Sequence, residues 1–207
     1  DVDERSPRCS DRPLENMAQA TRRFGEKFRN AGYKSSIMPA AEELAFVDRA
    51  GDFDIIQIAA HACIDNRDPI EYALLFSTDP DELEANMLTT GEIYQMEFKQ
   101  TRLAVLSNCS TGAGEIQRGE GIASIARAFT YAGCPSLITA INDIPEEPTA
   151  EILDYFYDRV LEGMPLDIAL QKARLAYLKK HPGKHPATWA NLIVFGDVRP
   201  LGNPALQ

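Results

Sequence analysis

The sequence lacks any apolar run long enough to cross a bilayer as a helix, which would need about 20 consecutive apolar residues. Its first residues, DVDERSPRCS, are mostly charged or polar and contain no apolar core of the kind found in secretory leaders. We therefore expect no transmembrane helix, no signal peptide and no membrane partner. Because the chain begins with Asp rather than Met, we also expect it to be a part or a processed form of a longer protein.

Cysteine is scarce, and its pattern excludes a secreted disulfide framework. The four cysteines, Cys9, Cys63, Cys109 and Cys134, lie far apart and form no CxxC pair. This spacing predicts reduced thiols and a cytoplasmic location. A metal site on His61, Cys63 and Cys109 is one interpretation of the nearby ligand types, but no pattern supplies a fourth ligand. We accordingly expect no metal ion and no cofactor.

Basic residues are outnumbered, with 21 Lys and Arg against 31 Asp and Glu and a formal net charge of -10. Sequence-independent nucleic-acid binding needs clustered Lys and Arg, so we expect no nucleic-acid partner. A basic or neutral polypeptide suits this surface better. Internal repeats and low-complexity tracts are also missing.

What the sequence does contain is enough apolar material for one large α/β domain, at 44% hydrophobic in 207 residues. Four short apolar runs predict buried strands, at residues 54–60, 102–107, 135–141 and 191–195. Their nearly continuous apolar character is typical of a parallel sheet that is covered on both faces.

Helical patterns alternate with these strands. Apolar residues at helical spacing predict four long helices, at residues 14–31, 122–132, 149–163 and 166–180. Thr149 is the expected N-cap of the third helix, and Gly163 its expected end. Thr89 followed by Glu92 is a capping-box signature that predicts a further short helix. The alternation of strands and helices predicts an open, mostly parallel α/β sheet.

The remaining segments predict loops and domain limits. Residues 77–86 are acidic, and residues 181–186 contain two prolines, so both are expected to be irregular. His181 and His185, each beside a proline, are expected to be solvated. We predict an irregular segment over residues 1–13, one domain over 14–200 and a tail over 201–207.

Two residues with nucleophilic and basic chemistry follow directly on predicted strands. His61 follows the strand at residues 54–60, and Cys109 follows the strand at 102–107. Ligands of open α/β sheets bind outside the carboxyl ends of the strands. If the two strands are neighbours, the thiol and the imidazole face one substrate, and the histidine can accept or relay the proton of the thiol. The backbone amides of Ala62 and Cys109 are the candidates for an oxyanion hole.

Plainer interpretations exist for both residues. A cysteine at the end of a buried strand is usually a small core residue, and a lone histidine beside an apolar strand is usually structural. What favours the catalytic interpretation is the paired position at two strand ends, together with the resemblance described next.

Four segments, taken in order, resemble the CHAT domain, a caspase relative often joined to tetratricopeptide repeats. They read IIQIAAHAC, RLAVLSNCSTGAGEIQRGEGIASIARAFTYAGCPSLITAI, PTAEILDYFYDRVLEGMPLDIALQKARLAYL and PATWANLIVFGD. The resemblance implies a caspase-like three-layer α/β/α sandwich. It also implies that His61 is the catalytic histidine and Cys109 the nucleophile of a cysteine endopeptidase.

Two positions depart from the pattern of the family. Ala62 stands where the family usually has glycine, although an alanine amide can still donate a hydrogen bond. The segment that usually contains tryptophan after the third strand reads NDIPE here. Because this segment resembles the wall that receives the substrate side chain in caspase relatives, we expect Asp143 and Glu146 to bind a substrate lysine or arginine.

The sequence thus predicts a cysteine endopeptidase that acts on polypeptide substrates. The architecture usual in the family implies regulation by a repeat domain or a partner protein. The alternative is a catalytically silent CHAT-type domain that uses the same cleft for protein interaction.

Overall fold

The computed structural model describes residues 14–38, 43–64, 72–76, 86–107, 120–141 and 145–202. Its central sheet has the strand order β1-β5-β6-β7. These strands are β1 (Ile55–Ile58), β5 (Leu103–Leu106), β6 (Ser136–Ala140) and β7 (Leu192–Gly196). The first three are parallel, and β7 runs antiparallel to β6. All four predicted strands are confirmed, and so is the mostly parallel sheet.

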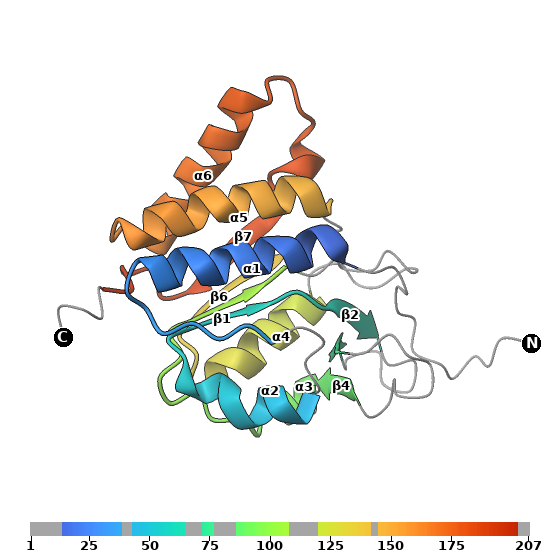
Figure 1. Cartoon of the computed structure of the whole chain (residues 1–207). Helices are drawn as coiled ribbons and strands as arrows, with labels where there is room; N and C mark the ends of the chain where they lie inside the picture. The colour runs from blue at the N-terminus through green and yellow to red at the C-terminus, as the bar shows by residue number, and fades with distance from the viewer. Residues whose placement is uncertain are drawn as a thin grey trace, which may run out of the picture.

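Helices cover both faces of this sheet and make a three-layer sandwich (Figure 1). One layer contains α1 (Glu15–Asn30), α5 (Glu146–Leu161) and α6 (Leu166–Lys180). On the opposite face lie α4 (Glu120–Tyr131), α2 (Glu43–Arg49) and the short α3 (Thr90–Ile93). No helix in the described ranges is long and apolar enough to span a membrane.

Strand β5 explains why the strand sequences are apolar at every position. Leu103 and Val105 pack into the hydrophobic core under α1, α5 and α6. The alternate residues, Ala104 and Leu106, pack into the second core, under α4. All four side chains are fully buried. Side chains of a strand alternate between its faces, so a strand between two helical layers needs apolar residues throughout.

The helix ends follow local sequence, with one correction. The capping box of α3 is confirmed, because the Glu92 backbone N–H donates to Thr89 Oγ1 and the Thr89 N–H donates to the Glu92 carboxylate. The prediction that Thr149 caps α5 is wrong, since α5 begins at Glu146 with Pro145 as N-cap. Thr149 lies inside the helix, where its hydroxyl donates to the Pro145 carbonyl at 2.8 Å.

A second sheet, which the sequence did not predict, continues from β1. It is antiparallel, and its strands are β2 (His61–Ile64), β3 (Tyr72–Leu75) and β4 (Met87–Thr89). Short 3-10 helices occur at Ala50–Asp52 and Pro186–Thr188. Of the predicted acidic loop, residues 77–85 lie outside the described part of the chain.

His181 is not the solvated loop residue that we predicted. Its Nε2 lies 2.9 Å from the Glu151 carboxylate, and its ring packs against Tyr177 with centroids 4.6 Å apart. Lys180 also donates to Glu151, at 2.9 Å. Burial opposes ionisation of Glu151, but the hydrogen bonds from Lys180, His181 and Tyr155 outweigh it and lower the pKa of this carboxyl. The histidine therefore helps to join the end of α6 to α5.

Candidate active site

The two strands that precede His61 and Cys109 are neighbours. β1 pairs with β5 in parallel, with Ile58 opposite Leu106, so both strands end at the same edge of the sheet. This adjacency was the assumption on which the sequence-based site depended. Parallel neighbours lie about 4.8 Å apart, and residues just beyond their carboxyl ends therefore emerge close to one another.

His61 is the first residue of β2, separated from β1 only by Ala59 and Ala60. It lies opposite Leu75 of β3 in the antiparallel pairing, and its side chain is buried. The backbone of Ala62, a candidate oxyanion donor, lies in the same strand opposite Leu74. The histidine is thus fixed at the junction between the central sheet and the smaller one.

Two predicted site residues, Cys109 and Asp143, lie outside the described residues. The metal interpretation depended on Cys109 and on the Cys63 side chain, which also falls outside this description. The chain is described up to Ser107, two positions before the cysteine. The structure therefore shows the strand end that leads to the candidate nucleophile.

A partly buried chain of hydrogen bonds connects the ends of β1 and β5 to α5. Tyr157 Oη donates to Gln57 Oε1 at 2.5 Å, and Gln57 Nε2 donates to Ser107 Oγ at 2.8 Å. The Ser107 hydroxyl then donates to the Ile58 carbonyl at 3.2 Å. Each donor named here makes one hydrogen bond. The chain thus links Ser107, two positions before Cys109, with Ile58, three positions before His61.

This network was not predicted, although the sequence contains half of its signal. Gln57 is the one polar residue in the apolar segment IIQIAA. An amide side chain in an otherwise apolar strand requires hydrogen-bond partners, so this position could have been singled out. Nothing local indicates that its partner is Tyr157, which lies 100 residues further along the chain. Burial raises the pKa of Tyr157, so its hydroxyl stays protonated as a donor.

Glu146, proposed above to bind a substrate side chain, contacts the start of α1. Its Oε2 accepts a hydrogen bond from the Met17 backbone N–H at 3.1 Å. That amide is in the first turn of α1, where backbone N–H groups lack partners within the helix and a negative charge is favourable. The carboxylate therefore caps α1 and also lies at the beginning of α5, directly after the segment that contains Asp143.

Cys134 shows what a structural cysteine looks like in this fold. It is fully buried, and its thiol donates to the Ser136 carbonyl at 3.2 Å. Burial raises the pKa of this thiol to about 11. A protonated, enclosed thiol is a poor nucleophile. Cys134 is thus a packed residue just before β6.

The fold and the strand ends define a caspase-like α/β/α domain. The structure is similar to the crystal structure of the Arg specific cysteine proteinase gingipain R (RgpB), with a TM-score of 0.61 and 14% sequence identity. The likeness covers 88% of this chain and 42% of that one. At this identity the comparison shows the fold alone.

The model of the CHAT domain family matches residues 3–197, so the chain belongs to the CHAT domain family. Its relatives include tetratricopeptide repeat protein 28 of Mus musculus, 23% identical over 128 residues, and the Homo sapiens protein of the same name, 22% identical over 128 residues. Each match covers 62% of this chain and 5% of the relative. The chain thus corresponds to a small part of these much longer proteins.

Proposed function

We propose that this chain is a cysteine endopeptidase that cleaves polypeptides with His61 and Cys109. The observation that carries the proposal is the parallel pairing of β1 with β5, because the chain runs from the two adjacent strand ends to these two residues. Membership of the CHAT family and a fold similar to that of a cysteine proteinase support it.

In the proposed reaction, the Cys109 thiol gives its proton to His61, and the thiolate attacks the carbonyl carbon of the scissile peptide bond. The backbone amides of Ala62 and Cys109 donate to the resulting oxyanion. As the C–N bond breaks, His61 protonates the leaving amine. His61 then takes a proton from water, whose oxygen attacks the thioester. The C–S bond of the tetrahedral intermediate then breaks and the carboxylic acid leaves, while His61 returns its proton to the Cys109 sulfur and restores the thiol.

We further propose that Asp143 and Glu146 select a lysine or arginine side chain beside the scissile bond. Both acids follow β6 along the chain, and β6, which is parallel to β5, ends at the same edge of the sheet as β1 and β5. Glu146 uses Oε2 for the Met17 amide, and within the described residues its Oε1 makes no hydrogen bond. That oxygen could accept from a substrate cation without loss of the helix cap. Kinetics on a peptide library test this preference, and preferred apolar residues at that position would exclude it.

Regulation is the second part of the proposal. The relatives are named as tetratricopeptide repeat proteins and are far longer than this chain. We propose that a repeat domain or a partner protein controls access of the polypeptide substrate, and that the enzyme works in the cytoplasm. Activity of the isolated chain that equals its activity with such a domain would contradict the regulatory part alone.

Labelling with a thiol-directed acyloxymethyl ketone tests the dyad. We expect the wild-type chain to be labelled at Cys109, the Cys109→Ala variant to lose labelling, and the His61→Ala variant to react at least about 100-fold more slowly, in line with the usual contribution of a general acid or base. Cys134→Ala is the matched control and should react like the wild type, because its thiol is buried. Mass spectrometry of the labelled peptides gives the site.

Labelling that is unaffected by both the His61 and the Cys109 substitutions would contradict the peptidase. It would favour the alternative function, a CHAT-type domain that uses its cleft for protein interaction without catalysis. Thermal unfolding of each variant must accompany the measurement, so that loss of reaction is not confused with loss of fold.

A further inference from the structure

The last described rung between β1 and β5 is doubled by a side chain. The Ser107 backbone N–H donates to the Ile58 carbonyl at 3.0 Å, and the hydroxyl of the same serine donates to the same carbonyl at 3.2 Å. A carbonyl oxygen has two lone pairs and can accept both hydrogen bonds. Ser107 is 4% exposed, so water competes little for either bond. The serine thus joins the two strand ends twice at one point.

Gln57 sets the direction of the Ser107 hydroxyl. Gln57 lies opposite Val105, whose side chain packs into the core under α1, α5 and α6. Side chains two residues apart lie on the same face of a strand, so Ser107 lies on this face as well. Gln57 Nε2 donates to Ser107 Oγ at 2.8 Å, which leaves the proton of the hydroxyl for the Ile58 carbonyl.

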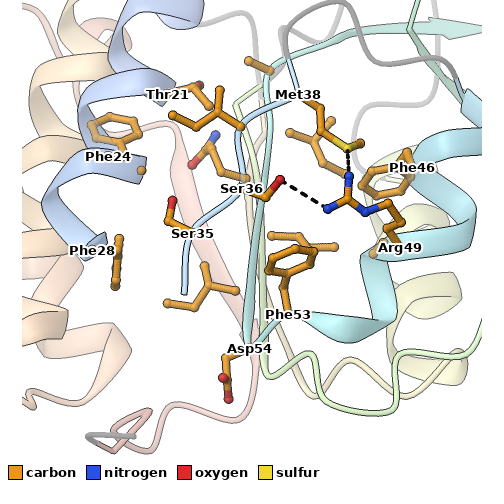
Figure 2. A pocket seen from close by; sticks show the side chains of 18 of the residues that line it. Thr21, Phe24, Phe28, Ser35, Ser36, Met38, Phe46, Arg49, Phe53 and Asp54 are labelled. Carbon is orange, nitrogen blue, oxygen red and sulfur yellow. Dashed lines mark hydrogen bonds between the residues drawn. The ribbon is translucent and has the colours of Figure 1, made fainter. Parts of the chain in front are cut away.

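Tyr157 holds Gln57 in turn, beside aromatic side chains. The Tyr157 hydroxyl donates to Gln57 Oε1 at 2.5 Å. Both residues line a cavity of about 850 Å³, and Phe24 and Phe28 of α1 contribute aromatic rings to its wall (Figure 2). An amide beside such rings is stabilised by the hydrogen bonds that it already makes. Helix α5 therefore fixes, through one amide, a hydroxyl at the end of β5.

The two candidate catalytic residues follow this rung closely in the chain. Two alanines separate Ile58 from His61, and one residue separates Ser107 from Cys109. Three residues of extended chain span at most about 11 Å, and two residues at most about 7 Å. A shift of one strand end against the other is therefore transmitted to both residues through very little intervening chain.

The proposed reaction is sensitive to such a shift. The thiol must lie within hydrogen-bond reach of the imidazole to give up its proton. A misplacement of about 1 Å can lower a rate about 100-fold. A side chain that fixes the terminal rung can therefore control the rate without contacting the substrate.

We propose that Ser107 and Gln57 are positioning residues, which hold the ends of β1 and β5 at the separation that lets His61 take the proton of Cys109. This inference rests on the proposed function of that pair. It differs from a purely structural role in what it predicts. Groups that only stabilised the fold would change the free energy of unfolding and leave the reaction rate of the folded protein unchanged.

Four single variants of the complete 207-residue chain test the proposal. Ser107→Ala removes the hydroxyl, and Ser107→Thr keeps it. Gln57→Glu keeps an acceptor for Tyr157 but, when ionised, cannot donate to Ser107. Thr101→Val is the matched control, because Thr101 is 2% exposed and its hydroxyl donates to the Ala50 carbonyl at 2.9 Å near the opposite end of β5. Thermal unfolding confirms that each variant is folded.

The first measurement is the reaction of Cys109 with increasing concentrations of the acyloxymethyl ketone, which separates binding of the reagent (KI) from the rate constant of the covalent step (kinact). We expect Ser107→Ala and Gln57→Glu to lower kinact about tenfold or more and to leave KI within about twofold of the wild type. Ser107→Thr should keep kinact within about threefold, because its hydroxyl can make the same bonds. Thr101→Val should react like the wild type.

The second measurement does not require the chain to be a peptidase. NMR follows the titration of the His61 ring in the wild type and in Cys109→Ala. A neighbouring thiolate stabilises the imidazolium, so the wild-type His61 should bind its proton at least about tenfold more tightly than His61 of the Cys109→Ala variant. Adding Ser107→Ala should abolish most of this difference, whereas adding Thr101→Val should preserve it.

The two measurements distinguish failure of the peptidase from failure of the positioning role. Labelling that is unaffected by Cys109→Ala and His61→Ala would refute the peptidase, and the titration would still decide the positioning role. That role is overturned if Cys109→Ala leaves the titration of His61 unchanged, because the strand ends would then hold no interacting pair.

The variants supply the remaining decisive outcomes. A Ser107→Ala chain that keeps the wild-type kinact or the His61 difference would overturn the proposal. So would a Thr101→Val chain that loses as much as Ser107→Ala, or a Ser107→Thr chain that is as slow, since the hydroxyl at the terminal rung would then not be the cause. A wild-type kinact in Gln57→Glu would remove the positioning role from Gln57 alone.

Discussion

Gln57 is a half-buried polar side chain in an otherwise apolar strand, and its two hydrogen-bonding neighbours determine how it can be oriented. Tyr157 donates to its oxygen, while its nitrogen donates to Ser107. Since the Ser107 hydroxyl continues to the Ile58 carbonyl, the network joins the ends of both strands that lead into the candidate site. Buried networks in which every group is satisfied favour a single arrangement of the surrounding backbone.

Removal of the Tyr157 hydroxyl tests the contribution of this network. We expect Tyr157→Phe to lower the free energy of unfolding by about 1–3 kcal/mol, because the half-buried Gln57 oxygen loses its donor. Tyr155→Phe is the matched control two residues away, where the hydroxyl bonds to Glu151 near the surface, and its effect should be about 1 kcal/mol or less. Urea denaturation measures both. Equal losses of unfolding free energy in the two variants would show that the hydrogen bond of Tyr157 stabilises the protein no more than one near the surface.

The network also shows that long-range side-chain contacts cannot be predicted from the sequence at the scale of single residues. The position of Cys109 and His61 after two apolar runs could be read directly, because strand signals are local. The side chains that support them could not, since Tyr157 belongs to a helix 100 residues away from Gln57. The same holds for Glu146, whose contact with the Met17 amide depends on the packing of α5 against α1.

At the scale of elements, β7 ends in a turn that only glycine can make without strain. Gly196 has φ 82°, and a Cβ at this position would lie 2.1 Å from the Pro135 carbonyl oxygen. Gly163, after α5, has φ 79°, but a Cβ there would meet nothing within 4 Å. The two glycines thus share a backbone conformation and differ in the space around them.

This difference predicts unequal costs for the same substitution. We expect Gly163→Ala to lower the free energy of unfolding by about 1 kcal/mol, the cost of a left-handed alanine. Gly196→Ala adds a backbone clash and should cost about 3 kcal/mol or more. Chemical denaturation of the two variants side by side gives the comparison. Similar losses of unfolding free energy in the two variants would mean that β7 and the loop at Pro135 separate easily.

Elements with strong local signals were predicted, and weak ones were missed. α6 was predicted at its observed bounds, Leu166–Lys180, because its apolar positions repeat with helical spacing. Strands β2, β3 and β4 contain only three or four residues each and show no clear alternation. Pairing with one another defines them, and pairing is not visible in single segments. The start of α5 was misplaced because Thr149 has the chemistry of a cap but lies one turn too late.

At the scale of the whole molecule, one sheet separates two hydrophobic cores. Phe156 lies in the core under α1, α5 and α6, while Phe129 lies in the core under α4. Among the described residues, the single tryptophan, Trp189, packs against the first core and not against the second. Because β5 contributes fully buried side chains to both cores, neither helical layer can leave without exposing it. The sandwich should therefore unfold as one cooperative unit, as is usual for single domains.

Trp189 fluorescence tests this cooperativity. Phe129→Ala, in the core that Trp189 does not touch, should lower the free energy of unfolding by about 3–5 kcal/mol, as should Phe156→Ala in the nearer core. If the layers are coupled through β5, both variants shift the fluorescence transition and the far-ultraviolet circular dichroism transition together. A Phe129→Ala variant whose fluorescence midpoint stays at the wild-type value would contradict the coupling. In that case the layer of α4 would unfold on its own. The strands β1 and β5, which lead into the two candidate catalytic residues, would then be covered by helices on one face only.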